Sequence, residues 1–337
     1  MLNTNQQMSN SILLPFEDEP PPSKGLMPHP YSTQIFSDIL ECKLLWNTFS
    51  PHQTIYDVWE FRLAFYLAYQ HQPYFIVLYH QQAPVGLLPL WYDSDKQHYD
   101  WFGSYWHEHN NFWVTDQQHL PFLLESLPTP IVLKAINPSQ IKKLNGQLPP
   151  NLILQPDEPT FALNFDQITN HEDYFKTLKK KTRYNLKRDW LKIAQLNPIV
   201  TYDRFNDIQA LIELNTQRFL DKGEQPDCLD PRRAQALKNL LILALESRAY
   251  QIRMISIEIE QQLAVVDMIA IYQDIYYSIK GGSDLRNFPG IGNYINLLEI
   301  DDACLLKMKK IDFLQSPQGW KYTWFQPQEL WMLKNIT

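Results

Sequence analysis

Hydrophobic and polar positions along the first half of the chain follow a pattern that predicts one α/β unit. Pro73 ends an apolar, aromatic-rich stretch with helical spacing, and Gln81–Pro84 provide a turn between two apolar runs, which is typical of a hairpin. The expected elements are helices over 56–69 and 120–127 and strands over 74–80, 85–92, 99–102 and 131–135. Helices and strands in this succession indicate a sheet covered by helices.

The second half predicts a second unit of the same class. Short polar turns separate three strands between residues 251 and 280, which favours an antiparallel meander. The helix expected over 172–194 has one face made by Phe175, Leu178, Thr182, Leu186, Trp190 and Ile193, which step by three or four. The other expected elements are strands over 160–165, 199–202, 251–258, 263–272, 275–280 and 310–314, helices over 207–220, 231–246 and 293–309, and a final pair of short aromatic strands.

Breaks in these patterns divide the chain into three parts. Residues 1–30 are rich in Asn, Gln, Ser and Pro and predict a flexible leader. Residues 145–159 carry a glycine and four prolines without clear periodicity, so a domain boundary is expected there. The predicted domains therefore span 31–150 and 151–337.

Composition narrows the class of protein. The chain of 337 residues is 45% hydrophobic and 13% aromatic, which is enough apolar material for two packed cores. The three cysteines lie far apart in no paired motif, which predicts free thiols in a reducing compartment. No signal peptide and no apolar run of membrane-spanning length is evident, so we expect a cytoplasmic protein without a membrane span. The net charge of −7 gives no overall attraction for nucleic acid, and DNA is not an expected partner.

One loop suggests a phosphate-binding site. The segment Arg286–Tyr294 follows the predicted meander and opens a helix, and it contains Gly290 and Gly292. The first turn of a helix presents unpaired N–H groups and a positive dipole end, which suit a pyrophosphate, and glycines let the ligand approach the backbone. The alternative is an ordinary turn in which Asn293 caps the helix.

The order of elements and this loop resemble the GNAT (general N-acetyltransferase) superfamily. Further segments resemble the CelD-type acetyltransferases, relatives of the Fem peptidoglycan aminoacyltransferases: the basic helix 178–188, the strand 84–90, and 311–314 followed by 320–324. The resemblance implies an α/β (α+β) fold of two tandem GNAT-like domains, each a mixed, mostly antiparallel sheet flanked by helices. It also implies acetyl-CoA or another acyl-CoA as co-substrate, bound by Arg286, Gly290, Ile291, Gly292, Asn293 and Tyr294.

A basic segment contrasts with the acidic chain around it. Residues 176–192 hold eight basic side chains and one acidic one, so the rest of the chain carries −14. Lys181, Arg183 and Asn185 are therefore candidate substrate-binding residues that recognise phosphates of a cofactor or of a nucleotide-linked or tRNA-linked substrate. The alternative is a solvated helix face.

Three residues are candidates for catalysis. Asp267 is the only charge in an apolar run, and a buried carboxylate with a shifted pKa can remove a proton from an attacking amine. Lys321 and Tyr322 lie where the family has a terminal Tyr-Lys pair, in reversed order; a lysine can stabilise negative charge on the acyl carbonyl, and a tyrosine can protonate a leaving thiolate. Purely structural roles stay open for Asp267 and Lys321.

The segment Trp106–Asn110 contains two histidines that resemble part of a metal site, but two ligands with this spacing need further partners, and no metal is expected. We interpret it as an aromatic acceptor loop, with Tyr105 and Trp106 stacking on substrate.

The sequence thus predicts an N-acyltransferase that moves an acyl group from acyl-CoA to a small-molecule amine, an amino sugar or a peptide held between the domains. Two alternatives remain: a Fem-like transferase that uses aminoacyl-tRNA, and a non-catalytic GNAT-like scaffold.

Overall fold

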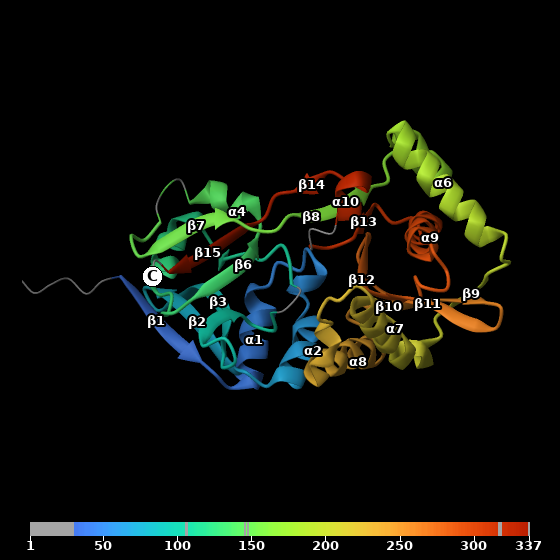
Figure 1. The fold of residues 1–337 in the computed structure, drawn as a ribbon. Coiled ribbons are helices and arrows are strands. Elements are labelled where there is room, and N and C mark those ends of the chain that lie inside the picture. Colours follow the sequence, from blue (N-terminus) through green and yellow to red (C-terminus); the bar gives the residue numbers. More distant parts are fainter. Residues whose placement is uncertain (1–29, 105–106, 145, 147, 316–318, 336–337) are drawn as a thin grey trace, which may run out of the picture. The chain divides into compact units, whose positions relative to one another are not determined.

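The amino-terminal half is built on an antiparallel sheet in the order β1-β2-β3-β4, with the short β5 paired to β3. The computed structural model describes residues 30–104, 107–144, 146, 148–315 and 319–335 (Figure 1). The strands are β1 (Tyr31–Phe36), β2 (Gln72–His80), β3 (Ala83–Asp93), β4 (His98–Trp101) and β5 (Trp113–Val114), and the helices are α1 (Ile39–Phe49), α2 (Trp59–Tyr69), α3 (Leu120–Glu125) and α4 (Pro138–Lys143).

The carboxy-terminal half is built on a seven-stranded sheet in the order β14-β8-β13-β12-β11-β10-β9. The pairs β9–β10, β10–β11 and β11–β12 are antiparallel, as the polar turns predict, whereas β12 and β13 are parallel because α9 connects them. The strands are β8 (Thr160–Asn164), β9 (Ile199–Tyr202), β10 (Gln251–Ile259), β11 (Gln262–Tyr272), β12 (Ile275–Ser283), β13 (Lys310–Asp312) and β14 (Pro327–Gln328). The helices are α5 (His171–Thr177), α6 (Lys180–Ala194), α7 (Ile208–Asp221), α8 (Pro231–Ser247), α9 (Ile291–Leu305) and α10 (Gly319–Trp324).

The two halves are joined by a third sheet and a common core. In the third sheet β15 (Trp331–Asn335), near the end of the chain, lies between β6 (Val132–Ile136) and β7 (Leu152–Pro156). Helix α2 packs against α8, and one hydrophobic cluster contains residues of both, such as Phe65 and Leu237. Residues 31–337 form one compact unit in which this packing is continuous. A domain boundary near residue 150 stays a prediction.

One predicted element is wrong in detail, and one helix was not predicted. The helix expected over 172–194 is two helices, because Leu178 adopts an extended backbone and its N–H closes α5 on the Phe175 carbonyl. The break lets α5 bury Tyr174 and Phe175 while α6 packs separately on α9. The expected final pair of short strands corresponds to β14 and β15, and the unpredicted helix α10 precedes them, with a helical hydrogen bond from the Phe325 N–H to the Lys321 carbonyl.

A buried ion pair connects α9 to the meander. Arg253 donates to both carboxylate oxygens of Asp302, at 2.5 and 2.7 Å, and the Tyr276 hydroxyl donates to the same carboxylate at 3.1 Å. The Asp302 side chain has no exposed surface. Removing Asp302 would leave the largely buried Arg253 with only the 44% exposed Asp203 as an ion-pair partner among the described residues, at 3.3 Å.

We therefore expect Asp302→Ala to lower the free energy of unfolding by about 3 kcal/mol, as measured by urea denaturation. The matched control is Asp274→Ala, which removes an ion pair with Lys309 whose two side chains are 54% and 81% exposed. That change should cost less than about 1 kcal/mol. Equal losses in the two variants would contradict the assignment.

Candidate active site

A cavity of about 580 Å³ opens between α7, the beginning of α9, and the strands β11 and β12. It is lined by residues from many separate segments, including the loop before α9 and the segment between β13 and α10. Three predicted cofactor residues, Gly290, Gly292 and Asn293, line this cavity, and so do the predicted catalytic residues Asp267 and Lys321. Residues that lie far apart in the sequence are thus brought to one place.

The loop before α9 presents its backbone to the cavity. Gly290 precedes the helix with φ of 102°, a conformation that glycine adopts without strain, and α9 begins at Ile291. No carbonyl of the described residues accepts a hydrogen bond from the N–H of Gly290 or Gly292. Unpaired N–H groups and the positive end of the α9 dipole therefore meet at the cavity wall.

The other predicted cofactor residues have different positions. Ile291 is fully buried and anchors α9 in the core, and the Tyr294 ring stacks on Trp190 with centroids 4.4 Å apart. Arg286 lines an adjoining cavity of about 440 Å³ together with Arg218 and Lys222, which also line the main cavity. The structure thus places positive charge beside the glycine loop.

Asp189 brings a carboxylate to the same loop. It lies on α6, and its Cβ would be 3.2 Å from a Cβ added to Gly290, so only glycine fits at that position without displacing α6. Asn293 donates its side-chain amide to Asp189 at 2.8 Å instead of capping the helix. Arg188 partly compensates the charge through bonds of 2.8 and 3.0 Å to the other carboxylate oxygen.

The Asp267 carboxyl lines the cavity and interacts with the fully buried carboxyl of Glu299. Asp267 lies in β11 opposite Gly281, whose missing side chain leaves room for it: a Cβ there would be 2.5 Å from the Asp267 carboxyl. Burial raises the pKa of Asp267 to about 7, and burial together with the Asp267 charge raises the pKa of Glu299 on α9 well above its ordinary value. Glu299 therefore holds its proton more strongly than Asp267, which leaves Asp267 as the group that ionises near neutral pH.

Lys321 lies 6% exposed at the edge of the cavity. Its ammonium donates hydrogen bonds to the carbonyls of Phe313, Leu314 and Gln315 at 2.6, 3.0 and 2.7 Å, so all three of its protons point to backbone oxygens. Burial lowers its pKa to about 8. In this geometry Lys321 fixes the backbone of a cavity-lining segment.

Glu108 is a cavity residue that the sequence analysis did not select. It comes from the amino-terminal half, is 1% exposed, and accepts a hydrogen bond from the Gln315 N–H. Its other oxygen has no hydrogen-bond partner among the described residues, and burial raises its pKa to about 7. The sequence feature that could have pointed to Glu108 is its place as the only acidic residue in the predicted acceptor loop, residues 106–110.

The remaining candidates lie elsewhere. Tyr322 is 49% exposed, and its ring packs edge-on against Phe161 without lining the cavity. Lys181, Arg183 and Asn185 lie on α6 and line neither of the two cavities described above. Tyr105 and Trp106 lie outside the described residues.

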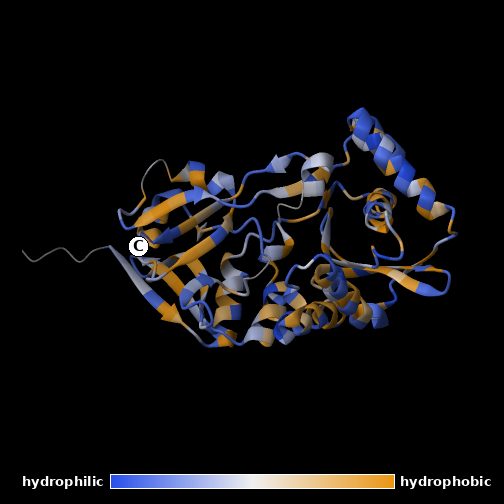
Figure 2. Cartoon of the chain, viewed as in Figure 1, coloured by the Kyte–Doolittle hydropathy of each residue, from blue (hydrophilic) through white to orange (hydrophobic). Residues whose placement is uncertain are grey.

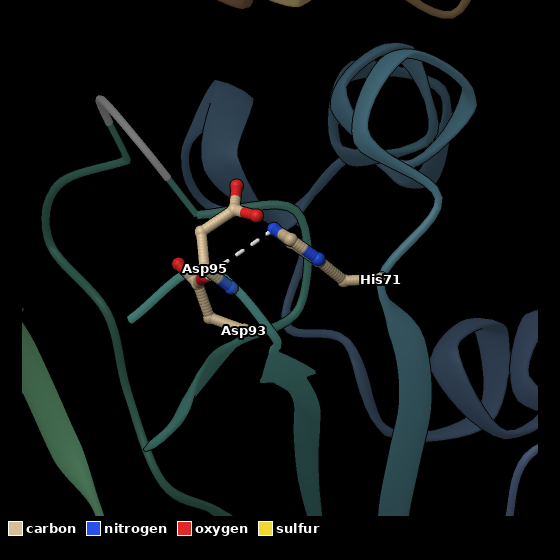
Figure 3. Close-up of side chains that lie close together, drawn as sticks. All are labelled: His71, Asp93 and Asp95. Atoms are coloured by element: carbon tan, nitrogen blue, oxygen red, sulfur yellow. Dashed lines mark hydrogen bonds and ion pairs between the residues drawn. The ribbon is translucent and has the colours of Figure 1, made fainter. Parts of the chain in front are cut away.

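One cluster has the composition of a metal site. Within the described ranges, His71, Asp93 and Asp95 form a group whose potential ligand atoms lie within 4.8 Å of one another, and Figure 3 shows the His71 ring beside the two carboxylates. Lys96 pairs with Asp93 at 2.9 Å and Arg232 pairs with Asp95 at 2.7 Å. A metal ion would have to displace both cations, so the cluster fits an ion-pair network better.

Comparison with known proteins identifies the class. Residues 180–322 match the Acetyltransferase (GNAT) domain family. The fold is similar to FemX, with a TM-score of 0.59, 9% identity and coverage of 90% of this chain and 97% of that one. It is also similar to a tandem GNAT protein from the clavulanic acid biosynthesis pathway, with a TM-score of 0.52, 8% identity and coverage of 90% and 98%. A conserved protein of unknown function from Bacteroides thetaiotaomicron VPI-5482 has a TM-score of 0.59, 12% identity and coverage of 90% and 100%.

These findings define an α/β protein of mostly antiparallel sheets flanked by helices, with a fold similar to that of a tandem GNAT protein. Residues 180–322 thus form an acetyltransferase domain of the GNAT class, and the fold over 90% of the chain is similar to those of FemX and of a tandem GNAT protein. The predicted fold class is thereby confirmed, and the predicted GNAT superfamily is supported by the match of residues 180–322. No curated protein sequence matches the chain. No helix among the described residues is long and apolar enough to cross a membrane.

Proposed function

We propose that this chain is an N-acyltransferase that transfers an acyl group from acyl-CoA, with acetyl-CoA as the expected donor, to an amine acceptor in the cytoplasm. The observation that carries the proposal is that the glycine loop at the start of α9 and the Asp267 carboxyl line the same cavity. The glycine loop is suited to binding an anionic donor, and the Asp267 carboxyl is suited to removing a proton from an amine acceptor.

The donor site rests on the geometry of the loop. The pyrophosphate of CoA would accept hydrogen bonds from the N–H groups of Gly290 and Gly292 and interact with the positive end of α9. Arg218, Lys222 and Arg286 line the adjoining cavity and would place positive charge near the remaining phosphate. The donor would thus bind over the amino-terminal end of α9, with its thioester directed toward β11.

The acceptor site rests on Asp267. The amine nitrogen attacks the thioester carbonyl, the new C–N bond forms, and the C–S bond breaks to release the CoA thiolate. Asp267 takes the proton that the nitrogen loses, because its pKa of about 7 suits a general base at neutral pH. Lys321 holds the cavity-lining carbonyls of residues 313–315 in place, so we assign it a positioning role. The acceptor classes that fit are a small amine, an amino sugar or a peptide amine.

A Fem-like reaction with aminoacyl-tRNA is the second candidate. Asp189 supports it, because its carboxylate lies against Gly290, where it would repel a pyrophosphate. The uncompensated lysines of α6 also favour a polyanionic donor. The −14 charge on the rest of the chain opposes a large RNA contact surface, which is why acyl-CoA remains the first candidate.

The donor site is tested at Gly292. A Cβ there would be 3.3 Å from the flexible end of Leu285, so small substitutions are tolerated. We expect Gly292→Asp to weaken acetyl-CoA binding at least tenfold in calorimetric titration, because it places a negative charge at the first turn of α9. Gly292→Ala adds the same Cβ without charge and should keep the affinity within about threefold.

The titration also includes longer acyl-CoAs. Equal affinity of the aspartate and alanine variants for every acyl-CoA would place the pyrophosphate elsewhere. Absence of acyl-CoA binding by the wild-type protein would reject the first candidate, and aminoacyl-tRNA would then be assayed as the donor; a protein that uses neither would be a binding scaffold.

A further inference from the structure

The outer face of α6 has no role in the proposed reaction. Three basic residues in and near this helix have carboxylate partners: Lys176 with Asp173, Lys187 with Glu172 and Arg188 with Asp189. Five others have no ion-pair partner among the described residues: Lys179, Lys180, Lys181, Arg183 and Lys192. The surplus of positive charge is therefore not neutralised by the protein's own acidic residues.

Large apolar side chains lie on the same face. Tyr184 is 69% exposed and Leu191 is 59% exposed, and their spacing of seven residues places them one above the other along the helix. Lys180, Arg188 and Lys192 lie within the same half of the helix by the 3.6-residue period. Figure 2 shows most of α6 as hydrophilic with isolated apolar positions.

Two further exposed apolar side chains follow the helix in the chain. Leu196 is 36% exposed, and Ile199 at the start of the edge strand β9 is 65% exposed. The opposite face of α6 holds the core contacts: Leu186 and Ile193 are buried, and the helix packs on α9. The outer side chains are therefore not needed to attach α6 to the protein.

A helix with cations around exposed aromatic and aliphatic residues fits an anionic bilayer surface. In such a contact the apolar residues enter the boundary between headgroups and acyl chains while the lysines interact with anionic headgroups. Proteins bind RNA with basic residues and with aromatic side chains on which the bases stack. The exposed aliphatic residues Leu191, Leu196 and Ile199 have no such use and favour a bilayer as the partner. The −14 charge on the rest of the chain would confine binding to this one face.

We propose that the outer face of α6, with the following turn to Ile199, docks the enzyme reversibly on an anionic lipid membrane. Lys180, Lys181 and Lys192 contact the headgroups, and Tyr184, Leu191 and Ile199 insert at the interface. Each lysine or arginine near an anionic surface adds about fivefold in affinity, so five of them suffice for measurable binding without a membrane span.

The test is cosedimentation of the full chain with vesicles. We expect binding to phosphatidylcholine vesicles that contain about one third phosphatidylglycerol, and little binding to phosphatidylcholine alone. Lys180→Glu with Lys181→Glu should weaken binding at least tenfold, and so should Tyr184→Ser with Leu191→Ser. Raising the salt concentration should weaken the wild-type interaction as well.

Two matched controls exclude general effects of charge and hydrophobicity. Lys142→Glu with Lys334→Glu makes the same change in net charge on α4 and β15. Leu245→Ser with Leu305→Ser removes leucines that are 54% and 78% exposed elsewhere. Both should bind the vesicles as the wild type does. The proposal is overturned if the wild-type protein does not bind anionic vesicles, or if the α6 variants bind them as well as the controls do. It is also overturned if vesicle binding is weak and tRNA displaces the vesicles completely.

Discussion

Replacing Asp267 with asparagine is expected to lower kcat by about 10²- to 10³-fold while leaving acyl-CoA affinity within about twofold. The amide keeps the shape of the side chain but cannot accept a proton from the acceptor amine. The measurement is a steady-state assay of CoA release with a saturating amine, combined with calorimetry for the donor. This prediction depends on the proposed N-acyltransferase activity.

The pH dependence of kcat/KM can show whether Asp267 or Glu108, which also lines the cavity, is the general base. Both Asp267 and Glu108 have a pKa raised by burial to about 7, so the wild-type kcat/KM should rise with pH through that range as the general base loses its proton. Asp267→Asn should abolish this rise, whereas Glu108→Gln should retain it. If the rise persists in the asparagine variant and disappears in the glutamine variant, Glu108 is the base and our assignment is wrong.

Asp267→Asn, which should lower the activity, should raise the stability of the fold. Between pH 4 and 7 the folded protein keeps a proton on Asp267 that the unfolded chain, with an ordinary aspartate pKa of 3.8, has lost. Stability therefore falls as the pH rises through this window, and the penalty persists above it. Asp267→Asn lacks the penalty and should unfold at a higher urea concentration than the wild type at pH 8.

Much of the carboxy-terminal fold could be predicted because its signals are local. Polar turns separate β10, β11 and β12, the Asp230–Pro231 pair starts α8, and β9 has the bounds that the sequence predicted. The return of β15 to pair with β6 and β7 could not be predicted, because that pairing joins residues far apart in the chain and leaves no periodic signal in either segment. The short α10 was missed because its aromatic composition favours a strand.

The site shows the same division between local and long-range information. Gly290 and Gly292 could be selected because a glycine turn before a helix is visible in the sequence, and Asp267 because it interrupts an apolar run. Glu108 could not be assigned to the cavity, since only the fold brings it beside Gln315. Glu299 lies in α9 shortly before Asp301 and Asp302, so it does not stand out as the single charge of an apolar run as Asp267 does.

Lys321→Met is expected to lower the free energy of unfolding by about 3 to 5 kcal/mol, because methionine keeps the stem of the side chain but removes its charge. The carbonyls of residues 313–315 would lose their donor, and the buried Glu108 and Asp312 would lose a cation that lies near both. Urea denaturation at pH 7, followed by tryptophan fluorescence, measures the loss.

The control and the kinetics decide between a positioning and an oxyanion role for Lys321. Lys309→Met removes an ammonium that is 81% exposed and should leave the free energy of unfolding almost unchanged. A positioning role predicts that Lys321→Met raises KM for the acceptor as well as lowering kcat, because the cavity wall at residues 313–315 loses its order. A variant that keeps wild-type stability and KM but loses kcat would show instead that the ammonium acts on the acyl carbonyl in the transition state.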